Sequence, residues 1–313
     1  MGSAMPETHP TASAAAVPGS ARVVIIGGGV IGTSVAYHLA HLGWTDVVLL
    51  ERDQLTSGTT WHAAGLIVSG GMTTETLAWM TKYSTDLYAA LEDETGLSTG
   101  FKPVGYLQTA SNPERMHKLR READFLRLAG IEREEISARE VADLWPHVDP
   151  TDVIGGFFTA SEGRADPYNV AMSLAAGARA LGVRVVQGAP VTGITRRDGR
   201  VTGVVTERGT IEAEYVVNCA GMWARQIGAM AGVAVPLQAI EHAHSHTDPH
   251  EGVPPHQPNY EAPHRFAYSP QETGGLMFGH YDPVAAPWSI DRVPADFSFG
   301  EFPADWDRIA PFL

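Results

Sequence analysis

The sequence predicts an α/β fold that combines a nucleotide-binding domain with a partial, mainly antiparallel second domain. Three observations carry this prediction: an apolar strand at Val23–Ile26, a glycine-rich turn directly after it, and a second apolar run at Val47–Leu50. A strand, a glycine turn, a helix and a parallel strand in this order form the first βαβ unit of a Rossmann-like sheet. Later alternating runs predict a β-meander beside that parallel sheet.

The glycine turn has the spacing of a dinucleotide-binding motif. Gly27, Gly29 and Gly32 form G-x-G-x-x-G, and Glu51 follows nineteen positions after the last of them. These glycines permit a tight turn, close approach to a pyrophosphate and helix packing, while the helix N-terminus attracts phosphate. Glu51 can accept a hydrogen bond from a ribose hydroxyl. An ordinary strand-to-helix turn is the alternative interpretation, and the motif alone does not separate a nicotinamide cofactor from a flavin.

Length and composition limit the class of protein. The 313 residues can form two domains, because one core stops growing near about 250–300 residues. The net charge of −14, from 36 acidic and 22 basic side chains, argues against nucleic acid or an anionic membrane as a partner. No run of about 18 apolar residues is present, and the single Cys219 excludes an intrachain disulfide. We therefore expect a cytoplasmic protein without nucleic-acid or membrane partners.

The first half of the chain continues with helices and short strands. Residues 1–20 are rich in Ala, Ser, Thr and Pro and lack lysine and arginine, which predicts a disordered leader. Ser137 and Glu140 form a capping box for a brief helix that ends before Pro146. Apolar spacing predicts helices at 75–91 and 113–129 and strands at 104–107 and 154–160.

The second half begins with a helix and then a series of strands. Asp166 and Pro167 are typical of the N-cap and first residue of a helix, which we expect to run to about Leu181. The strand at 215–218 should be buried, and the small residues after it would let a ligand approach the carboxyl edge of the sheet. Further strands are expected at 183–187, 191–194, 201–207, 265–269 and 275–279, with a turn at Asp198–Gly199.

Six segments are shared with one protein family: IIGGGVIGTSVAYHLA, SGTTWHAAGL, EGRADP, YVVNCAGMWA, VPLQAIEH and GGLMFGHYDPVAAPWSIDRVPADF. They resemble the FAD-dependent dehydrogenases and oxidases of N-methylated glycines. These are the dimethylglycine and sarcosine dehydrogenase group of the D-amino-acid-oxidase-like flavoproteins. The resemblance runs from Arg22 to the C-terminus. Because SGTTWHAAGL is far more specific than the glycine motif, it favours FAD over a nicotinamide cofactor.

The resemblance implies an interrupted domain order and a shortened chain. After the leader at 1–20, the FAD-binding domain is expected at 21–100 and 156–235. The substrate domain is expected at 101–155 and 236–313. Relatives continue past the segment that corresponds to Trp306-Asp307-Arg308, so we expect the second part of the substrate domain to be incomplete and the chain to be C-terminally truncated.

The resemblance also assigns the cofactor residues. In the relatives, the histidine of the T-W-H segment is bonded to the 8α carbon of FAD, and its counterpart here is His62. A neutral imidazole is a competent nucleophile for such a bond. The alternative is a loop histidine that only packs beside the flavin. The predicted FAD-binding residues are Gly27, Gly29, Gly32, Glu51, Thr60, His62, Gly65, Ala220, Gly221 and Trp223.

His242 matches the position that faces the substrate amine in the relatives, and Tyr268 matches a tyrosine of their active site, with Tyr260 nearby in the sequence. Together they could hold the amine neutral and aligned for hydride transfer. The alternatives are an ordinary strand histidine and a packing tyrosine. His242, His244 and His246 alternate, so a strand would place them on one side in metal-ligand geometry, but we expect no metal. Asp166, Arg164 and Arg225 are expected in surface or capping roles.

The expected reaction is oxidative N-demethylation of an N-methylglycine such as dimethylglycine or sarcosine, with hydride transfer to FAD N5 and release of formaldehyde. Oxygen or an electron-transfer protein would accept the electrons. Two alternatives stay open: a flavin amino-acid oxidase of another substrate, and a truncated, non-catalytic flavoprotein or subunit that needs a second chain to supply the missing C-terminal part.

Overall fold

The computed structural model describes residues 16–288 and 293–312. The chain divides into two compact units, which are described separately. Unit 1 is built from Met1–Ser57, as far as that range is described, and Ala178–Pro236. Unit 2 is built from Gly58–Gly177 and Leu237–Leu313, again within the described residues. Among these residues, no helix is both long and apolar enough to cross a membrane.

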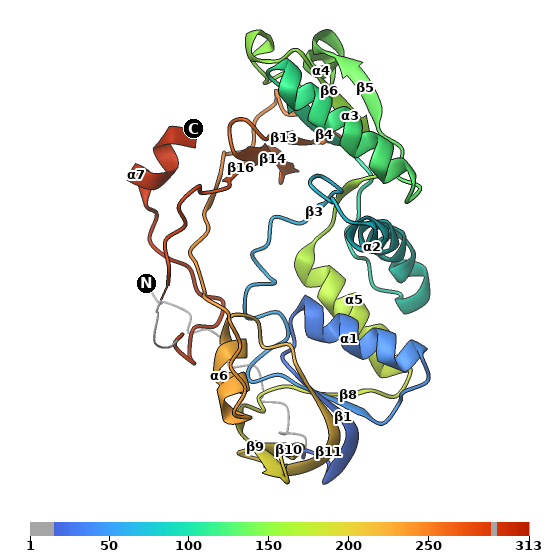
Figure 1. Ribbon diagram of the computed structural model, residues 1–313, viewed down its shortest axis with the longest axis vertical. Helices are drawn as coiled ribbons and strands as arrows, with labels where there is room; N and C mark the ends of the chain where they lie inside the picture. The colour runs from blue at the N-terminus through green and yellow to red at the C-terminus, as the bar shows by residue number, and fades with distance from the viewer. Residues whose placement is uncertain (1–15, 289–292, 313) are drawn as a thin grey trace, which may run out of the picture. The chain divides into compact units, whose positions relative to one another are not determined.

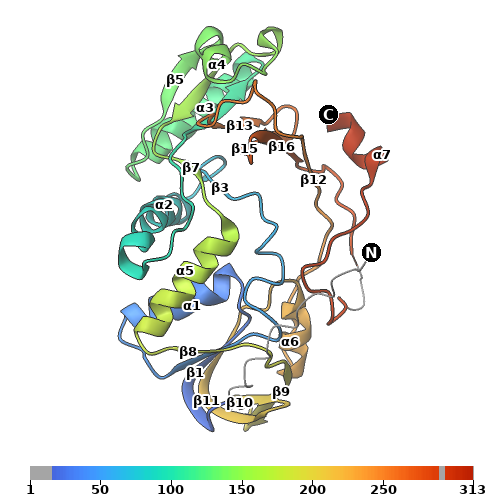
Figure 2. The ribbon, with the colours of Figure 1, turned by 180° about the vertical axis from the view of Figure 1, so that it is seen from behind.

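Unit 1 contains a six-stranded sheet in the order β8-β2-β1-β11-β10-β9 (Figure 1). The first four strands are parallel, and β9, β10 and β11 form the antiparallel meander. Figure 2 shows the meander and the neighbouring α6 from behind. The strands are β1 Ser20–Ile26, β2 Val47–Leu50, β8 Arg184–Val186, β9 Val191–Arg197, β10 Arg200–Thr206 and β11 Gly209–Asn218, with helices α1 Val30–His41 and α6 Ala224–Met230.

The core of unit 1 explains why these segments form strands. Val24 and Ile25 of β1 and Leu49 of β2 are fully buried, as expected for strands covered on both faces. The helix α1 ends at His41 with Leu42 as its C-cap residue, and Gly43 follows with a positive φ of 84°. That conformation costs glycine little, so Gly43 ends the helix as a C′ residue does.

Unit 2 contains a larger, mainly antiparallel sheet in the order β12-β16-β14-β13-β4-β6-β5, with β15 paired to β16. Only β13 and β4 pair in parallel among the described strands of this sheet. A separate ribbon joins β3 to β7. The strands are β3 Leu66–Ile67, β4 Tyr106–Ala110, β5 Glu134–Ser137, β6 Gly155–Thr159, β7 Gly163–Arg164, β12 His244–His246, β13 Asn259–Ala262, β14 Ala267–Ser269, β15 Gln271–Glu272 and β16 Gly275–His280.

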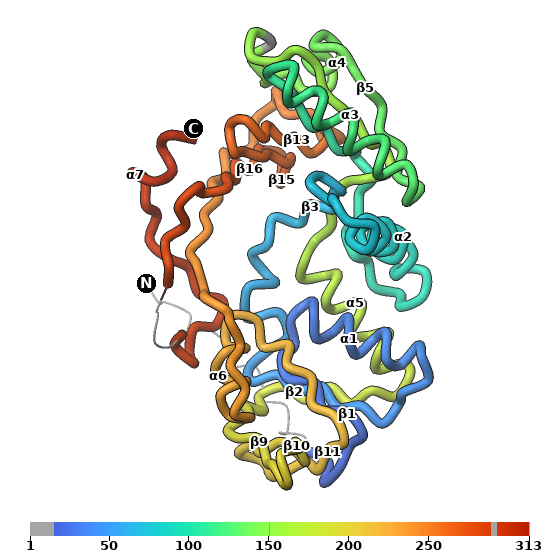
Figure 3. The backbone as a smooth tube through the Cα atoms, in the orientation of Figure 1, coloured from blue at the N-terminus to red at the C-terminus, as the bar shows by residue number. Residues whose placement is uncertain are grey.

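Helices α3 and α4 lie along one part of this sheet, as the tube in Figure 3 shows. The capping box of Ser137 and Glu140 is present at α4. The helix α5 begins at the predicted Pro167, and the Asp166 carboxylate accepts from the backbone N–H of Asn169 at 3.0 Å. The helices are α2 Glu75–Thr95, α3 Pro113–Arg127, α4 Ala138–Leu144, α5 Pro167–Ala180 and α7 Trp306–Ile309, with 3₁₀ turns at Pro150–Asp152, Gly221–Trp223 and Ala310–Phe312.

The α/β class, the parallel sheet with a meander and the mainly antiparallel second sheet confirm the predicted fold. Several boundaries differ. The strand predicted at 104–107 is β4 at Tyr106–Ala110, because Val104 turns back to the Lys102 carbonyl and Gly105 has a φ of 88°. The strand at 215–218 was expected to be buried, but it is the end of the longer β11, and Tyr215 is 47% exposed.

The structure describes only part of the predicted leader, and its compact units do not coincide with the predicted domains, whose boundaries stay a prediction. Residues 1–15 of the predicted leader lie outside the described residues, whereas Ser20 begins β1 and Val17 packs against the unit 1 core. The compact units change at Ser57 and within α5. Residues 58–100 and 156–177, predicted as parts of the FAD-binding domain, therefore pack within unit 2.

A chain of buried polar side chains crosses unit 2. The Arg133 guanidinium contacts Glu122 Oε1 at 3.3 Å and donates to Gln108 Oε1 at 3.0 Å. Gln108 donates to Glu261 at 3.3 Å, and the Tyr106 hydroxyl donates to the same carboxylate. The guanidinium thus pairs directly with Glu122 and is linked to Glu261 through the Gln108 amide. Buried charges of this kind are tolerated only when they are paired and hydrogen-bonded.

Glu162 is a further buried acid of unit 2. Its side chain is 2% exposed and lines a small cavity of about 110 Å³ beside Lys82 and Asp86. Burial raises the pKa of Glu162 to about 7. The folded state therefore binds this proton more tightly than the unfolded chain does.

We predict that Glu162→Gln flattens the pH dependence of stability. In the native protein, the proton on Glu162 stabilises the folded state at pH values below 4.5. This stabilisation is lost as the pH rises through about 7, which lowers the free energy of unfolding by about 3 kcal/mol. Urea unfolding at pH 5 and pH 8.5 measures the difference. The exposed Glu135, paired with Arg120, offers Glu135→Gln as the matched control. An unchanged pH slope in Glu162→Gln would contradict the assignment.

Candidate functional site

The glycine turn of unit 1 requires the absence of side chains. Gly27 has a φ of 112°, and a Cβ atom there would overlap the carbonyl oxygen of Cys219. A Cβ on Gly32 would overlap the carbonyl oxygen of Gly27. The backbone of β1, the turn and α1 can be this close only with glycine at both positions.

The N-terminus of α1 carries features that suit an anion. Gly29 is its N-cap residue, it makes no side-chain cap hydrogen bond, and no acidic residue lies in the first turn of the helix. The backbone N–H groups and the positive end of the helix dipole favour phosphate at this place. The turn therefore fits the pyrophosphate of a dinucleotide.

Glu51 has a structural task in addition to the predicted one. Its carboxylate accepts from the backbone N–H of Gly28 at 2.7 Å and from that of Asp53 at 2.9 Å. Burial raises the pKa of Glu51, and these hydrogen bonds oppose the shift. Each carboxylate oxygen can accept a further hydrogen bond. Glu51 therefore fixes the glycine turn and still has capacity for a ribose hydroxyl.

The end of β11 lies beside the same turn. The Cys219 carbonyl is next to Gly27, and Ala220 and Gly221 follow it at the carboxyl edge of the parallel strands. The Arg52 guanidinium lies 3.6 Å from the ring centroid of Trp223, which brings the end of β2 and the segment after β11 together. In unit 1 the structure thus gathers seven of the predicted cofactor residues at one edge: Gly27, Gly29, Gly32, Glu51, Ala220, Gly221 and Trp223.

The three other predicted cofactor residues belong to unit 2. Thr60 is buried, and Gly65 has a φ of 69° where a Cβ would overlap the Ala165 carbonyl oxygen. The His62 ring stacks on Trp61, with centroids 4.8 Å apart and an interplanar angle of 26°. Burial lowers the pKa of His62, and Glu301 opposes the shift. A neutral, half-buried imidazole is the form that can act as a nucleophile.

His242 and Tyr268 lie together in unit 2. His242 Nε2 and the Tyr268 hydroxyl oxygen are 3.3 Å apart, within hydrogen-bond distance. Tyr268 lies opposite Gly279 on β16, where a Cβ would overlap the tyrosine ring. Gly279 therefore provides the space across which the Tyr268 ring reaches His242.

The pKa shifts of this pair favour its neutral state. Burial lowers the pKa of His242, and the charges of His280 and Arg308 lower it further, while Asp282 opposes them. Burial raises the pKa of Tyr268 to about 12. At neutral pH the pair is an unprotonated imidazole, which can accept a proton, beside a phenol, which can donate a hydrogen bond.

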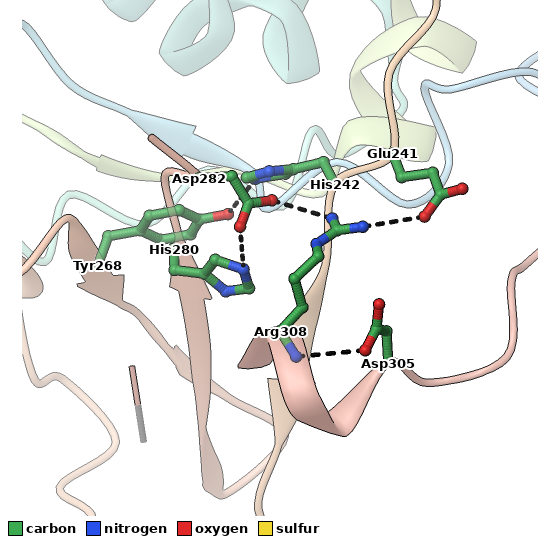
Figure 4. A network of polar contacts seen from close by, with 7 residues as sticks. All are labelled: Glu241, His242, Tyr268, His280, Asp282, Asp305 and Arg308. Atoms are coloured by element: carbon green, nitrogen blue, oxygen red, sulfur yellow. Dashed lines mark hydrogen bonds and ion pairs between the residues drawn. The ribbon is translucent and has the colours of Figure 1, made fainter. Parts of the chain in front are cut away.

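An ionic network surrounds the pair, as Figure 4 shows. Arg308 bridges Glu241 Oε2 and Asp282 Oδ2, each at 3.0 Å. His280 Nε2 lies 3.1 Å from the other oxygen of Asp282. Glu241, His280, Asp282 and Arg308 were not predicted as site residues. Each of them lies in a segment that resembles the family, and that resemblance was the available signal.

The sequence also singled out a possible histidine metal site and several charged residues. His242 precedes β12, so only His244 and His246 lie on that strand, and their rings are 5.0 Å apart. No group of three metal-ligating side chains forms within residues 16–288 and 293–312. Arg164 was expected at the surface, but burial lowers its pKa, and it donates to Gln271. Asp166 caps α5, as expected.

Comparison with known proteins identifies the family. The model of the family described as DAO, FAD dependent oxidoreductase, matches residues 22–313. The chain belongs to this family. The cofactor of these FAD-dependent oxidoreductases is FAD, and the turn, the α1 N-terminus and Glu51 fit its pyrophosphate and ribose.

Individual members of the FAD-dependent oxidoreductase family are similar over nearly the whole chain. A 4-methylaminobutanoate oxidase (formaldehyde-forming) of Paenarthrobacter nicotinovorans is 34% identical over 94% of this chain and 36% of its own length. The mitochondrial sarcosine dehydrogenase of Homo sapiens is 39% identical over 93% of this chain and 32% of its own length. This chain therefore spans about a third of the length of these curated relatives.

A solved structure supports the same fold. The L-proline dehydrogenase of P. horikoshii has a TM-score of 0.79 and 26% identity, covering 90% of this chain and 74% of that one. The chain thus shares its α/β fold with the structure of this L-proline dehydrogenase.

We predict that Gly32→Ala lowers the FAD content of the purified protein by at least about tenfold, because the added Cβ would overlap the Gly27 carbonyl oxygen. The absorbance of flavin per chain measures this content. Gly19→Ala is the matched control, since a Cβ at Gly19 meets nothing within 4 Å. Wild-type FAD content in Gly32→Ala would show that the turn does not hold the cofactor.

Proposed function

We propose that this chain carries the catalytic region of a FAD-dependent dehydrogenase or oxidase that demethylates an N-methylated glycine such as dimethylglycine or sarcosine. The hydrogen-bond distance between His242 and Tyr268, in a member of this family, is the observation that carries the proposal. The similarity to a 4-methylaminobutanoate oxidase (formaldehyde-forming) supports an N-methylated amino acid as substrate, and the similarity to a sarcosine dehydrogenase supports an N-methylated glycine.

His242 would accept the proton of the substrate ammonium group. A protonated amine has no free electron pair, so oxidation of its N-methyl carbon requires prior loss of this proton. The lowered pKa of His242 keeps its imidazole unprotonated near neutral pH. Tyr268, whose pKa is raised by burial, would stay a phenol and align the amine through its hydroxyl.

Bound FAD supplies a hydride acceptor, so an N-methyl group is oxidised to an iminium, which water converts to the demethylated amine and formaldehyde. Gly27, Gly29, Gly32 and Glu51 would hold the dinucleotide. We propose His62 as the residue of covalent attachment. Its half-buried, unprotonated ring supports this assignment, because the free imidazole nitrogen is the bond-forming atom.

The electron acceptor would be oxygen or an electron-transfer protein. A second candidate function is a non-catalytic flavoprotein, or a subunit whose site is completed by a second chain. The observation in favour of a subunit is the similarity to a relative named sarcosine oxidase subunit beta, of Rhizobium meliloti, which is 29% identical over 82% of this chain and 62% of its own length. Anaerobic reduction of the flavin by an N-methylglycine in the isolated chain would exclude this candidate. Reduction only after addition of a second polypeptide would support it.

The covalent link is tested by mass spectrometry of the digested protein. We expect one FAD on the peptide that contains His62, and a flavin that stays with the protein after denaturation and washing. His62→Ala should release all flavin under the same treatment. His250→Ala, which changes an exposed histidine of unit 2, should retain the link. A washed wild-type protein without yellow colour would disprove the attachment.

The reaction is tested by anaerobic stopped-flow reduction with sarcosine and dimethylglycine. His242→Asn should slow flavin reduction by about 10²–10⁴-fold, because the proton acceptor is lost. The pH limb assigned to His242 should lie below the ordinary histidine value of 6.5, since its pKa is lowered. Tyr268→Phe should slow reduction by a smaller factor, whereas the exposed Tyr168→Phe should not. A protein inert toward every N-methylglycine would refute the proposal.

A further inference from the structure

Arg308 connects the two segments on either side of the His242–Tyr268 pair. Its Nη1 lies 3.0 Å from Glu241, the residue before His242, and its Nη2 lies 3.0 Å from Asp282, two residues after β16. The Arg308 backbone N–H is fixed in turn by the Asp305 side chain at the start of α7. The bridge therefore ties the chain before β12 to the chain after β16.

Asp282 needs this bridge because it is buried. Its side chain is 6% exposed and is shared between Arg308 and His280. His280 is itself buried and stacks on Phe312, with ring centroids 4.3 Å apart. A carboxylate at such a depth is tolerated only when it is paired, so loss of Arg308 would leave Asp282 with His280 alone.

The groups that face His242 come from several elements. Tyr268 of β14 is within hydrogen-bond distance, and the Tyr281 ring after β16 has its centroid 6.5 Å from that of His242. His280 of β16 lies 6.2 Å away by the same measure. Asp282 and Arg308 also act on the imidazole by their charges, and His244 of β12 interacts electrostatically with it. The Asp282 and Arg308 charges act in opposite directions, so their pairing decides the balance at His242.

Arg308 is not placed to bind a substrate carboxylate. Both of its terminal nitrogens are already engaged by carboxylates of the chain, and its Nε is buried without a hydrogen-bond partner among the described residues. A ligand carboxylate would therefore compete with Glu241 and Asp282 for the same guanidinium charge.

We propose that Arg308 is a positioning residue: through Glu241 and Asp282 it holds the His242 ring against the Tyr268 hydroxyl and balances the Asp282 charge beside that ring. The role deepens the proposed function and rests on it for the kinetic readout only. The position and titration of His242 are properties of unit 2 that can be measured without turnover.

The test combines histidine titration with flavin reduction in the FAD-loaded full chain. Nuclear magnetic resonance of protein labelled at histidine follows each imidazole, and His242→Asn identifies the signal of His242. Arg308→Gln removes a positive charge, so we expect the His242 titration to move upward by about one pH unit. The reduction rate by sarcosine or dimethylglycine should fall by about tenfold or more, because the ring is no longer held in place.

Two further variants separate charge from geometry. Arg308→Lys keeps the charge but lacks the planar fork that spans two carboxylates. We expect its His242 titration to stay near that of the wild type while reduction slows. Glu241→Gln removes one arm of the bridge and should slow reduction without an upward shift of the titration. Either variant replaces Arg308→Gln if that protein does not fold.

Arg120→Gln is the matched control, because Arg120 forms an exposed ion pair with Glu135 in the same unit. It should leave both readouts unchanged. If Arg308→Gln and Arg308→Lys also match the wild type in titration and reduction, the positioning role is wrong. If no N-methylglycine reduces the wild-type flavin, the proposed function fails, and the titration of Arg308→Gln alone decides the inference.

Discussion

A Cβ atom on Gly32 would overlap the Gly27 carbonyl oxygen, and a Cβ on Gly279 would overlap the Tyr268 ring. Both functional regions of the protein therefore depend on the close approach of a bare backbone to another group. In unit 1 this approach sets the turn that presents the α1 N-terminus. In unit 2 it lets an aromatic side chain cross a neighbouring strand. Each arrangement is available to glycine alone.

The parts of the fold that sequence reasoning predicted are those with a local cause. The strand at Val47–Leu50, the capping box of Ser137 and Glu140, and the start of α5 at Pro167 follow from apolar runs and capping side chains within a few residues. By contrast, β13 at Asn259–Ala262 pairs with β4, about 150 residues earlier, and carries Glu261 toward Tyr106. β13 also pairs with the nearby β14, but its own residues Asn259-Tyr-Glu-Ala262 have no run of apolar side chains that predicts a strand.

The residues of the candidate site also divide into those that a local sequence pattern predicted and those that it did not. The glycine motif and Glu51 were visible as a spacing, whereas the additional role of Glu51 as acceptor from the Gly28 N–H required coordinates. His242 and Tyr268 were assigned by family resemblance and not by any pattern of their own. Arg308 was missed because its two carboxylate partners are distant in sequence, and an Arg in a short polar segment is typical of an exposed surface.

Cys219 adds a practical property to the turn of unit 1. Its thiol is half-buried, and burial raises its pKa to about 11, so it is almost entirely protonated and a poor nucleophile at neutral pH. The sequence contains no other cysteine. A thiol introduced at an exposed position would therefore outcompete the native one for a maleimide dye. Pairs of such labels, one in each unit, would allow fluorescence energy transfer to report the separation of the two units in solution without first removing Cys219.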